Sequence, residues 1–256
     1  MKIIVAIKQV PERDAQVRID AGGKWIEEAN MQWAMNESDA YALEEALQLK
    51  EKHGGEVVVL SAGPERAGTT IREALAKGAD RAIHITCDDL GSRDALGVAR
   101  LLAAAIQPES PDLLLTGLQS DDLGYGQTGV ILAELLNLPH ASLILHVDKT
   151  DAGLTVKREL EEGWFQNIEL PIPAVLSMQS GGSKLRYATL MGIKRARTKE
   201  VRQLAAAELP VPTASSAQLE RIALPQKQKS TQILSGSPKE TAAALVEKLK
   251  FEARIL

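Results

Sequence analysis

A glycine-bearing polar stretch at residues 116–129 is the part of this sequence with the clearest capacity to bind a ligand. It separates two apolar runs and carries Gly124, Gly126 and Gly129 among small polar residues. Backbone N–H groups in such a turn, followed by the positive end of a helix dipole, suit a phosphate. The stretch matches neither G-x-x-x-x-G-K-[ST] nor a G-x-G-x-x-G directly after a strand, so an ordinary turn-rich loop is the alternative.

The charge of this loop limits the ligand that it could hold. No Lys or Arg lies between residues 116 and 129, and Asp121 and Asp122 add two negative charges. A triphosphate would therefore lack compensating charge. If a nucleotide binds here, the sequence favours a monophosphate over ATP.

A second segment, residues 183–197, has the composition of a docking patch. Leu190 and Met191 are predicted to lie in an exposed turn before a basic run, and apolar residues ringed by charge are typical of protein interfaces. An ordinary core-packing turn with a solvated basic face is the alternative. The run contains Lys194, Arg195, Arg197, Lys199 and Arg202.

Catalytic motifs are not found in the sequence. It contains no G-x-S-x-G and no H-E-x-x-H, and Glu159, Glu161 and Glu162 are typical of a solvated hairpin. The single cysteine, Cys87, excludes a disulfide within the chain, and the acidic residues that follow it should raise the pKa of its thiol. The four histidines have no metal-binding spacing. We therefore expect a protein without a substrate-converting site of its own.

Length and composition predict one sizeable core with a small appendage. The chain has 256 residues, of which 45% are apolar. A net charge of −4 and an aromatic content of 3% argue against nucleic-acid binding. No apolar stretch approaches the ~20 residues that span a membrane, and the N-terminal apolar run is too short for a signal peptide. We expect a cytoplasmic protein with no membrane insertion.

The elements that would position these two segments alternate along the chain. Short β-branched runs predict strands, and longer amphipathic runs predict helices, with Ser92 as the N-cap of the third. This alternation predicts an α/β fold with a doubly wound, mostly parallel sheet, whose ligands bind beyond the carboxyl ends of the strands. The strands are expected at 2–7, 56–61, 81–86, 112–116 and 173–178, and the helices at 36–53, 65–77, 92–107 and 127–136.

Two regions depart from this alternation. Residues 142–148, 154–160 and 164–170 predict an antiparallel insertion before the last parallel strand. Residues 205–256 are rich in Pro, Ala and Ser and end in a helix at 238–251 that Ser237 should cap. We expect a domain over 1–204, and then either a floppy tail or, as we favour, an arm that wraps a partner subunit.

The sequence resembles the β subunit of electron-transferring flavoproteins from Met1 to about Val201, and more loosely beyond. Many short matches occur in order, which makes chance an unlikely explanation. They include residues 5–9 (Val-Ala-Ile-Lys-Gln), 35–36, 42–46, 76–82, 127–129, 156–163, 173–176 and 186–190. The resemblance implies an adenine-nucleotide-hydrolase-like, Rossmann-type sandwich.

The resemblance also implies the cofactors. In this family the β subunit buries a structural AMP, while FAD is held mainly by the larger α subunit. By position, the implied AMP site consists of Ala6, Asn36, Glu37, Ser38, Asp39, Ala62, Ser120, Asp121, Asp122, Leu123, Gly124, Tyr125, Gly126, Gln127, Thr128, Gly129, Val130 and Ile131. Bifurcating relatives bind a second FAD in place of AMP and usually carry a different loop here, so AMP is favoured.

Several partners are implied in the same way. The α subunit would form a heterodimer with this chain and contact residues 205–256. This heterodimer would accept electrons from partner dehydrogenases and pass them to an acceptor such as a quinone oxidoreductase. Leu190 matches the leucine that anchors dehydrogenases in this family. The implied docking residues are Arg186, Tyr187, Leu190, Met191, Ile193, Lys194 and Arg195. A stand-alone adenine-nucleotide-binding protein is the alternative of another class, although it would need neither the docking segment nor the arm.

Overall fold

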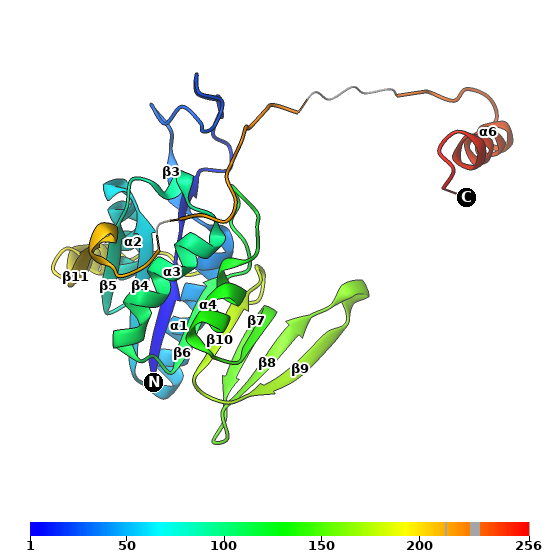
Figure 1. Cartoon of the computed structure of the whole chain (residues 1–256). Helices are drawn as coiled ribbons and strands as arrows, with labels where there is room; N and C mark the ends of the chain where they lie inside the picture. Colours follow the sequence, from blue (N-terminus) through cyan, green and yellow to red (C-terminus); the bar gives the residue numbers. More distant parts are fainter. Residues whose placement is uncertain (213, 226–230, 256) are drawn as a thin grey trace. The chain divides into compact units, whose positions relative to one another are not determined.

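The chain folds into two compact units in a computed structural model that describes residues 1–212, 214–225 and 231–255. The first unit comprises Met1–Ile222 and the second Ala223–Leu256. Both candidate segments belong to the first unit, which is built on a twisted sheet (Figure 1).

The main sheet has nine strands in the order β11-β5-β4-β1-β6-β10-β7-β8-β9. Strands from β11 to β7 run parallel, and β8 and β9 continue the sheet antiparallel. The predicted doubly wound, mostly parallel α/β fold is confirmed. The bounds are β1 Lys2–Ala6, β4 Glu56–Gly63, β5 Arg81–Thr86, β6 Leu113–Gly117, β7 His140–Lys149, β8 Leu154–Glu159, β9 Phe165–Leu170, β10 Ala174–Met178 and β11 Val201–Ala205.

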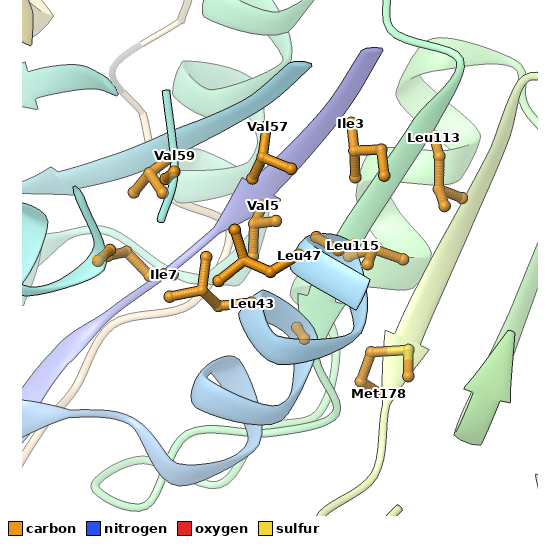
Figure 2. Close-up of a cluster of buried hydrophobic side chains, with 14 of the residues drawn as sticks. Ile3, Val5, Ile7, Leu43, Leu47, Val57, Val59, Leu113, Leu115 and Met178 are labelled. Carbon is orange, nitrogen blue, oxygen red and sulfur yellow. The ribbon is translucent and has the colours of Figure 1, made fainter. Parts of the chain in front are cut away.

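Helices cover both faces of the parallel strands, as Figure 1 shows. One face packs against α1 (Glu37–His53), α2 (Gly68–Lys77) and α5 (Leu190–Ala196), and the other against α3 (Ala95–Ile106) and α4 (Thr128–Leu136). Figure 2 shows the first of these layers, where strand side chains meet Leu43 and Leu47 of α1.

The alternation of side chains along each strand divides the core into two. In β1, Ile3 and Val5 join the cluster under α1, whereas Ile4 joins the cluster under α3 and α4. All three are fully buried, as expected for a parallel sheet that is covered on both faces. The continuous apolar run that follows Lys2 therefore reflects burial on both sides.

The predicted antiparallel insertion is smaller than expected. Of its three strands, β7 pairs parallel with β10 on one side and antiparallel with β8 on the other. Only β8 and β9 are therefore bounded by antiparallel pairs alone. Alternation of residue types along the chain is the same for both directions of pairing, so it could not separate β7 from its neighbours.

Among the described residues, three strands lie outside the ranges that the sequence predicted. β11 pairs parallel with β5 at the sheet edge, and its Arg202 and Gln203 are exposed, which hides the apolar signal. β2 (Gln9–Pro11) and β3 (Trp33–Met35) form a separate antiparallel pair. Each has only three residues, too few to show a period.

Helix boundaries follow the predicted ranges closely, with two corrections. The N-cap of α3 is Asp94, whose Oδ1 accepts a 2.8 Å hydrogen bond from Gly97 N, while Ser92 belongs to a preceding 3₁₀ turn. Leu190 and Met191 do not lie in a turn but begin α5, which Thr189 caps through a 3.0 Å bond from Gly192 N. Asp and Thr are both common N-cap residues.

The first unit continues beyond residue 204, where the sequence analysis placed its end. Leu209 and Val211 pack against the α3–α4 cluster, and Asp94 Oδ2 accepts hydrogen bonds from Ser216 N and Ala217 N. Of the predicted arm, residues 213, 226–230 and 256 lie outside the described residues. The second unit contains α6 (Pro238–Phe251), where Ser237 and Glu240 form the capping box that satisfies its first turn.

Candidate functional site

The carboxyl ends of β1 and β6 form the point at which the chain reverses direction across the sheet. From β1 the chain proceeds outward to β4 and β5, and from β6 it proceeds to the other side, where β7 and β10 lie. Ligands of doubly wound sheets bind at such a switch point, because the loops diverge there. We use the word crevice for this expected binding position, which comprises the carboxyl ends of β1 and β6 and the loops that follow them. Of the predicted residues, Ala6 ends β1 and Ala62 is the penultimate residue of the neighbouring strand β4.

Asp39 joins the two strand ends at the crevice. Its carboxylate accepts backbone hydrogen bonds from Lys8 N at 2.7 Å and from Gly117 N at 2.9 Å, one on each oxygen. Burial raises the pKa of Asp39 to about 7, although the bonds from Lys8, Asn36 and Gly117 act to lower the pKa. One buried carboxyl therefore links the backbone that follows β1 to the last residue of β6.

Asn36 and Ser38 hold the predicted phosphate loop against the start of α1. Asn36 Nδ2 and Ser38 Oγ donate to the Gln119 carbonyl at 2.9 and 2.8 Å, and Asn36 Oδ1 accepts from Asp121 N at 2.9 Å. Asn36 is only 1% exposed. Because both the nitrogen and the oxygen of its side-chain amide are bonded to the loop, a buried polar network fixes the loop.

Both loop carboxylates are engaged by neighbouring donors. Asp121 Oδ2 accepts a 3.0 Å bond from Glu37 N in the first turn of α1, and Asp122 pairs with Lys8 Nζ at 2.6 Å. Lys8 Nζ also lies 3.4 Å from Ser120 Oγ. The negative charge that argued against a phosphate is thus directed at a helix N-terminus and at a lysine.

Lys8 is the site residue that the sequence analysis left out. It lies 112–114 residues from its loop partners, so the absence of basic residues within 116–129 did not reveal it. Its position two residues after β1 was the available signal, because residues there meet those that follow β6.

The N-terminus of α4 closes the crevice beside β6 and β10. A Cβ at Gly129 would overlap Ser177 Oγ and Thr116 Oγ1, two hydroxyls that lie 3.1 Å apart at these strand ends. The side chain of Gln127, the N-cap, accepts no hydrogen bond from the first-turn N–H groups of α4. This arrangement fits the phosphate of a mononucleotide.

The remaining predicted loop residues have different surroundings. Gly124 and Gly126 have positive φ values of 65° and 62°, which glycine adopts without strain, while Leu123 and Tyr125 are exposed. Val130 is exposed on α4, whereas Ile131 packs against the α3–α4 cluster. The structure therefore brings the backbone of Gly117, Gln119 and Asp121 into the buried network, while Leu123, Tyr125 and Val130 are exposed.

The docking segment presents its apolar side chains to solvent. Tyr187 is 91% and Leu190 87% exposed, and Met191 and Ile193 are exposed beside them. Leu190, Met191 and Ile193 belong to α5, which lies close against α2, since a Cβ on Gly192 would overlap the Ala76 carbonyl, and Tyr187 precedes this helix. We call the exposed set Tyr187, Leu190, Met191 and Ile193 the apolar patch.

Two cations tie α5 to α2 from opposite sides. Arg72 Nη1 donates at 2.6 Å to the carbonyl of Ala196, the last residue of α5, and at 3.0 Å to that of Lys199 beyond it. Lys199 Nζ donates to the Leu75 and Ala79 carbonyls at the end of α2, at 3.0 and 2.5 Å. Lys199 is therefore a helix-capping residue and not part of a solvated basic face.

Sequence comparisons place the chain in a family. The model for the electron transfer flavoprotein domain matches residues 24–209. The chain is 38% identical to the electron transfer flavoprotein subunit beta of Methylophilus methylotrophus, over 96% of this chain and 97% of that protein. It belongs to the electron transfer flavoprotein family. Identity is 37% to the mitochondrial subunit beta of Oryza sativa subsp. japonica and 34% to the subunit beta of Bacillus subtilis (strain 168), each over the full length of both chains.

This membership supports a role in electron transfer. Cys87 Sγ donates to Asp89 Oδ1 at 2.7 Å, and burial together with this carboxylate raises the pKa of the thiol, as its neighbours predicted. Within the described ranges, no three His, Cys, Asp or Glu side chains are grouped to hold a metal. No helix in the described part of the chain has the length and apolar character needed to cross a bilayer.

Proposed function

We propose that this chain is the β subunit of a heterodimeric electron transfer flavoprotein that carries electrons from partner dehydrogenases to a downstream acceptor such as a quinone oxidoreductase. The observation that carries the proposal is the apolar patch, which is exposed at the start of α5 and just before it, on a helix bonded to α2. A chain without a need to meet other proteins gains nothing from such a surface. A cytoplasmic location remains a prediction.

The crevice supports AMP as the ligand of this subunit. The neutralised loop carboxylates, the buried Asn36 and the first turn of α4, which has no side-chain cap, fit one phosphate and a nucleoside. AMP would contribute binding free energy to the folded state, and no step of electron transfer is assigned to it. FAD, held mainly by the α subunit, would supply the redox chemistry.

The nucleotide content of the purified heterodimer tests this proposal. Acid denaturation followed by chromatography is expected to release one AMP and one FAD per heterodimer. Two FAD and no AMP would instead support a bifurcating flavoprotein. A chain that binds an adenine nucleotide but never pairs with an α subunit would support a stand-alone nucleotide-binding protein.

A substitution at the start of α4 locates the phosphate. Thr128→Arg is expected to lower the AMP content, because its bulk enters the first turn where the phosphate approaches. Thr150→Arg is the matched control, since Thr150 lies exposed at the β7–β8 turn of the same unit. Equal AMP content in both variants would place the nucleotide elsewhere.

A further inference from the structure

We infer that Arg186 is a positioning residue of the docking surface: its guanidinium bridges Glu44 and Glu51 of α1 and so fixes the start of the docking segment. It would thereby present Leu190 to a dehydrogenase without itself meeting that partner. The inference rests on the proposed function, because it assumes that the apolar patch docks a partner.

The Arg186 side chain is bonded on two sides. Its Nε and Nη2 donate to the two oxygens of Glu44 at 2.8 and 3.0 Å, and Nη1 and Nη2 donate to those of Glu51 at 2.6 and 3.2 Å. Its backbone N–H adds a 3.2 Å bond to Glu44. All three guanidinium nitrogens are thus directed at α1, which leaves little of the group for a second protein.

Glu44 and Glu51 can both be reached by one guanidinium. They lie seven residues apart, about two turns, so they share one face of α1. A planar guanidinium can bond both carboxylates at once, whereas a lysine ammonium has no such fork. Replacing Arg186 by Lys therefore keeps the charge and removes the bridge.

Burial separates this network from a docking charge. Glu44 is only 4% exposed, so a partner protein cannot reach its carboxylate. Although burial acts to raise the pKa of Glu44, the hydrogen bonds from Arg186 and Gln48 hold it below its ordinary value. Glu44 is therefore ionised and paired, and any effect of Glu44 on docking has to pass through Arg186.

The position in the chain gives the bridge its consequence. Arg186 lies four residues before Leu190, and beyond Leu190 the segment is held by Arg72 and Lys199 through α2. The apolar patch is therefore fixed at both ends, and a surface ordered before encounter loses less conformational entropy on binding. Without the bridge, the segment between residues 183 and 189 keeps the 3.3 Å bond from Ser183 Oγ to Glu45 as a weaker attachment to α1.

The test compares steady-state electron transfer from a partner dehydrogenase in full-length heterodimers, over a series of salt concentrations. Arg186→Lys and Glu44→Gln are each expected to raise KM for the flavoprotein roughly fivefold with kcat unchanged. The double variant should be no worse than either single variant, since both remove one bridge. Neither should change the salt dependence of KM, and flavin and AMP content should stay at wild-type levels.

Lys194→Gln is the matched control for a charge that does meet the partner. Lys194 is exposed on α5, so its loss should alter the salt dependence of KM. Should Glu44→Gln impair folding, Glu51→Gln provides the second arm, because Glu51 lies at the surface and shares the same guanidinium.

Three outcomes would overturn the inference: wild-type KM in Arg186→Lys, additive effects of Arg186→Lys and Glu44→Gln, or a changed salt dependence in Arg186→Lys. Leu190→Ala, measured beside them, separates this failure from failure of the proposed function. If Leu190→Ala transfers electrons at the wild-type rate, the docking surface itself is misplaced.

Discussion

The nucleotide crevice and the docking segment are both anchored on α1 but are built in opposite ways. At the start of α1, Asn36, Ser38 and Asp39 are buried and bonded to backbone groups of two strand ends and one loop. Farther along α1, Glu44 and Glu51 hold a segment whose functional side chains are exposed. A site for a small charged ligand is built from buried polar groups, which must be hydrogen-bonded to hold their positions. A docking surface for a transient protein partner needs exposed apolar groups on a rigid element.

This contrast predicts different consequences of mutation. Changes in the crevice should lower the free energy of unfolding and the nucleotide content together, because the same bonds serve both. Changes in the apolar patch should affect encounters with a dehydrogenase and leave the fold intact.

The largest expected effect is at the crevice, from Gly117→Ala. A Cβ there would overlap the Asp39 carboxylate and the Ser38 hydroxyl, so the link between β1 and β6 has to shift. We expect a loss of about 3 kcal/mol in the free energy of unfolding, with reduced AMP content. Urea denaturation measures it, and Gly91→Ala, where a Cβ meets nothing within 4 Å, is the control. Equal stability of the two variants would contradict the crevice geometry.

Leu190→Ala tests the other side of the comparison. Truncating an exposed anchor should cost about 2 kcal/mol of docking, or roughly thirtyfold in the kcat/KM of electron transfer. The flavin spectrum, AMP content and unfolding midpoint should remain at wild-type values. Leu135→Ala, an exposed leucine on α4, is expected to leave transfer unchanged. Loss of flavin together with activity would mean that Leu190 serves the fold.

Removal of residues 223–256 tests the second unit. In α6, Leu245, Val246 and Phe251 are exposed, which suits burial against the proposed α subunit. The chain 1–222 is expected to fold and to bind the α subunit at least about tenfold more weakly, as measured by analytical ultracentrifugation or titration. Leu245→Glu in the full chain should act in the same direction, while Lys239→Glu should not. Unchanged affinity would reject the wrapping arm.

The smallest expected effect concerns pH and Asp39. Since the pKa of Asp39 is raised to about 7 by burial, the folded protein binds a proton there between pH 4 and 7 that the unfolded chain does not. Its contribution to stability is therefore present at low pH and is lost as the pH rises through 7. Between pH 6 and 8 the wild type should lose about 1 kcal/mol that Asp39→Asn does not lose. Parallel stability profiles would show that Asp39 stays ionised.

Much of the fold could be predicted from local patterns. The central parallel strands are largely continuous apolar runs because both of their faces are buried, as for Ile3, Ile4 and Val5. The capping box of α6 follows from Ser237 and Glu240 alone. The edge strand β11 was missed because some of its side chains face solvent, so polar residues interrupt the apolar pattern there.

The crevice was predictable only as a set of strand ends. Sequence order states that residues after β1 and β6 meet, but not that Lys8 pairs with Asp122 or that Asp39 bridges Lys8 and Gly117. Those partners lie 31 to 114 residues apart, and their choice depends on side-chain packing. The sequence alone also misplaced Lys199 in a solvated basic run, although it caps α2.

The sequence by itself determined the alternation of strands and helices and the absence of common catalytic motifs, because each depends on residue type and local spacing. For Leu190 it left both a docking patch and a core-packing turn open, and the structure shows this residue exposed. Only the tertiary structure decided which charged side chains are paired or hydrogen-bonded within the molecule. Asp121, Asp122 and Arg186 could each have met a ligand or a partner, and the fold directs all three inward to α1 or to Lys8. The reason is physical: an ionised group binds the opposite charge or the donor that folding brings nearest, and distance along the chain does not fix that neighbour.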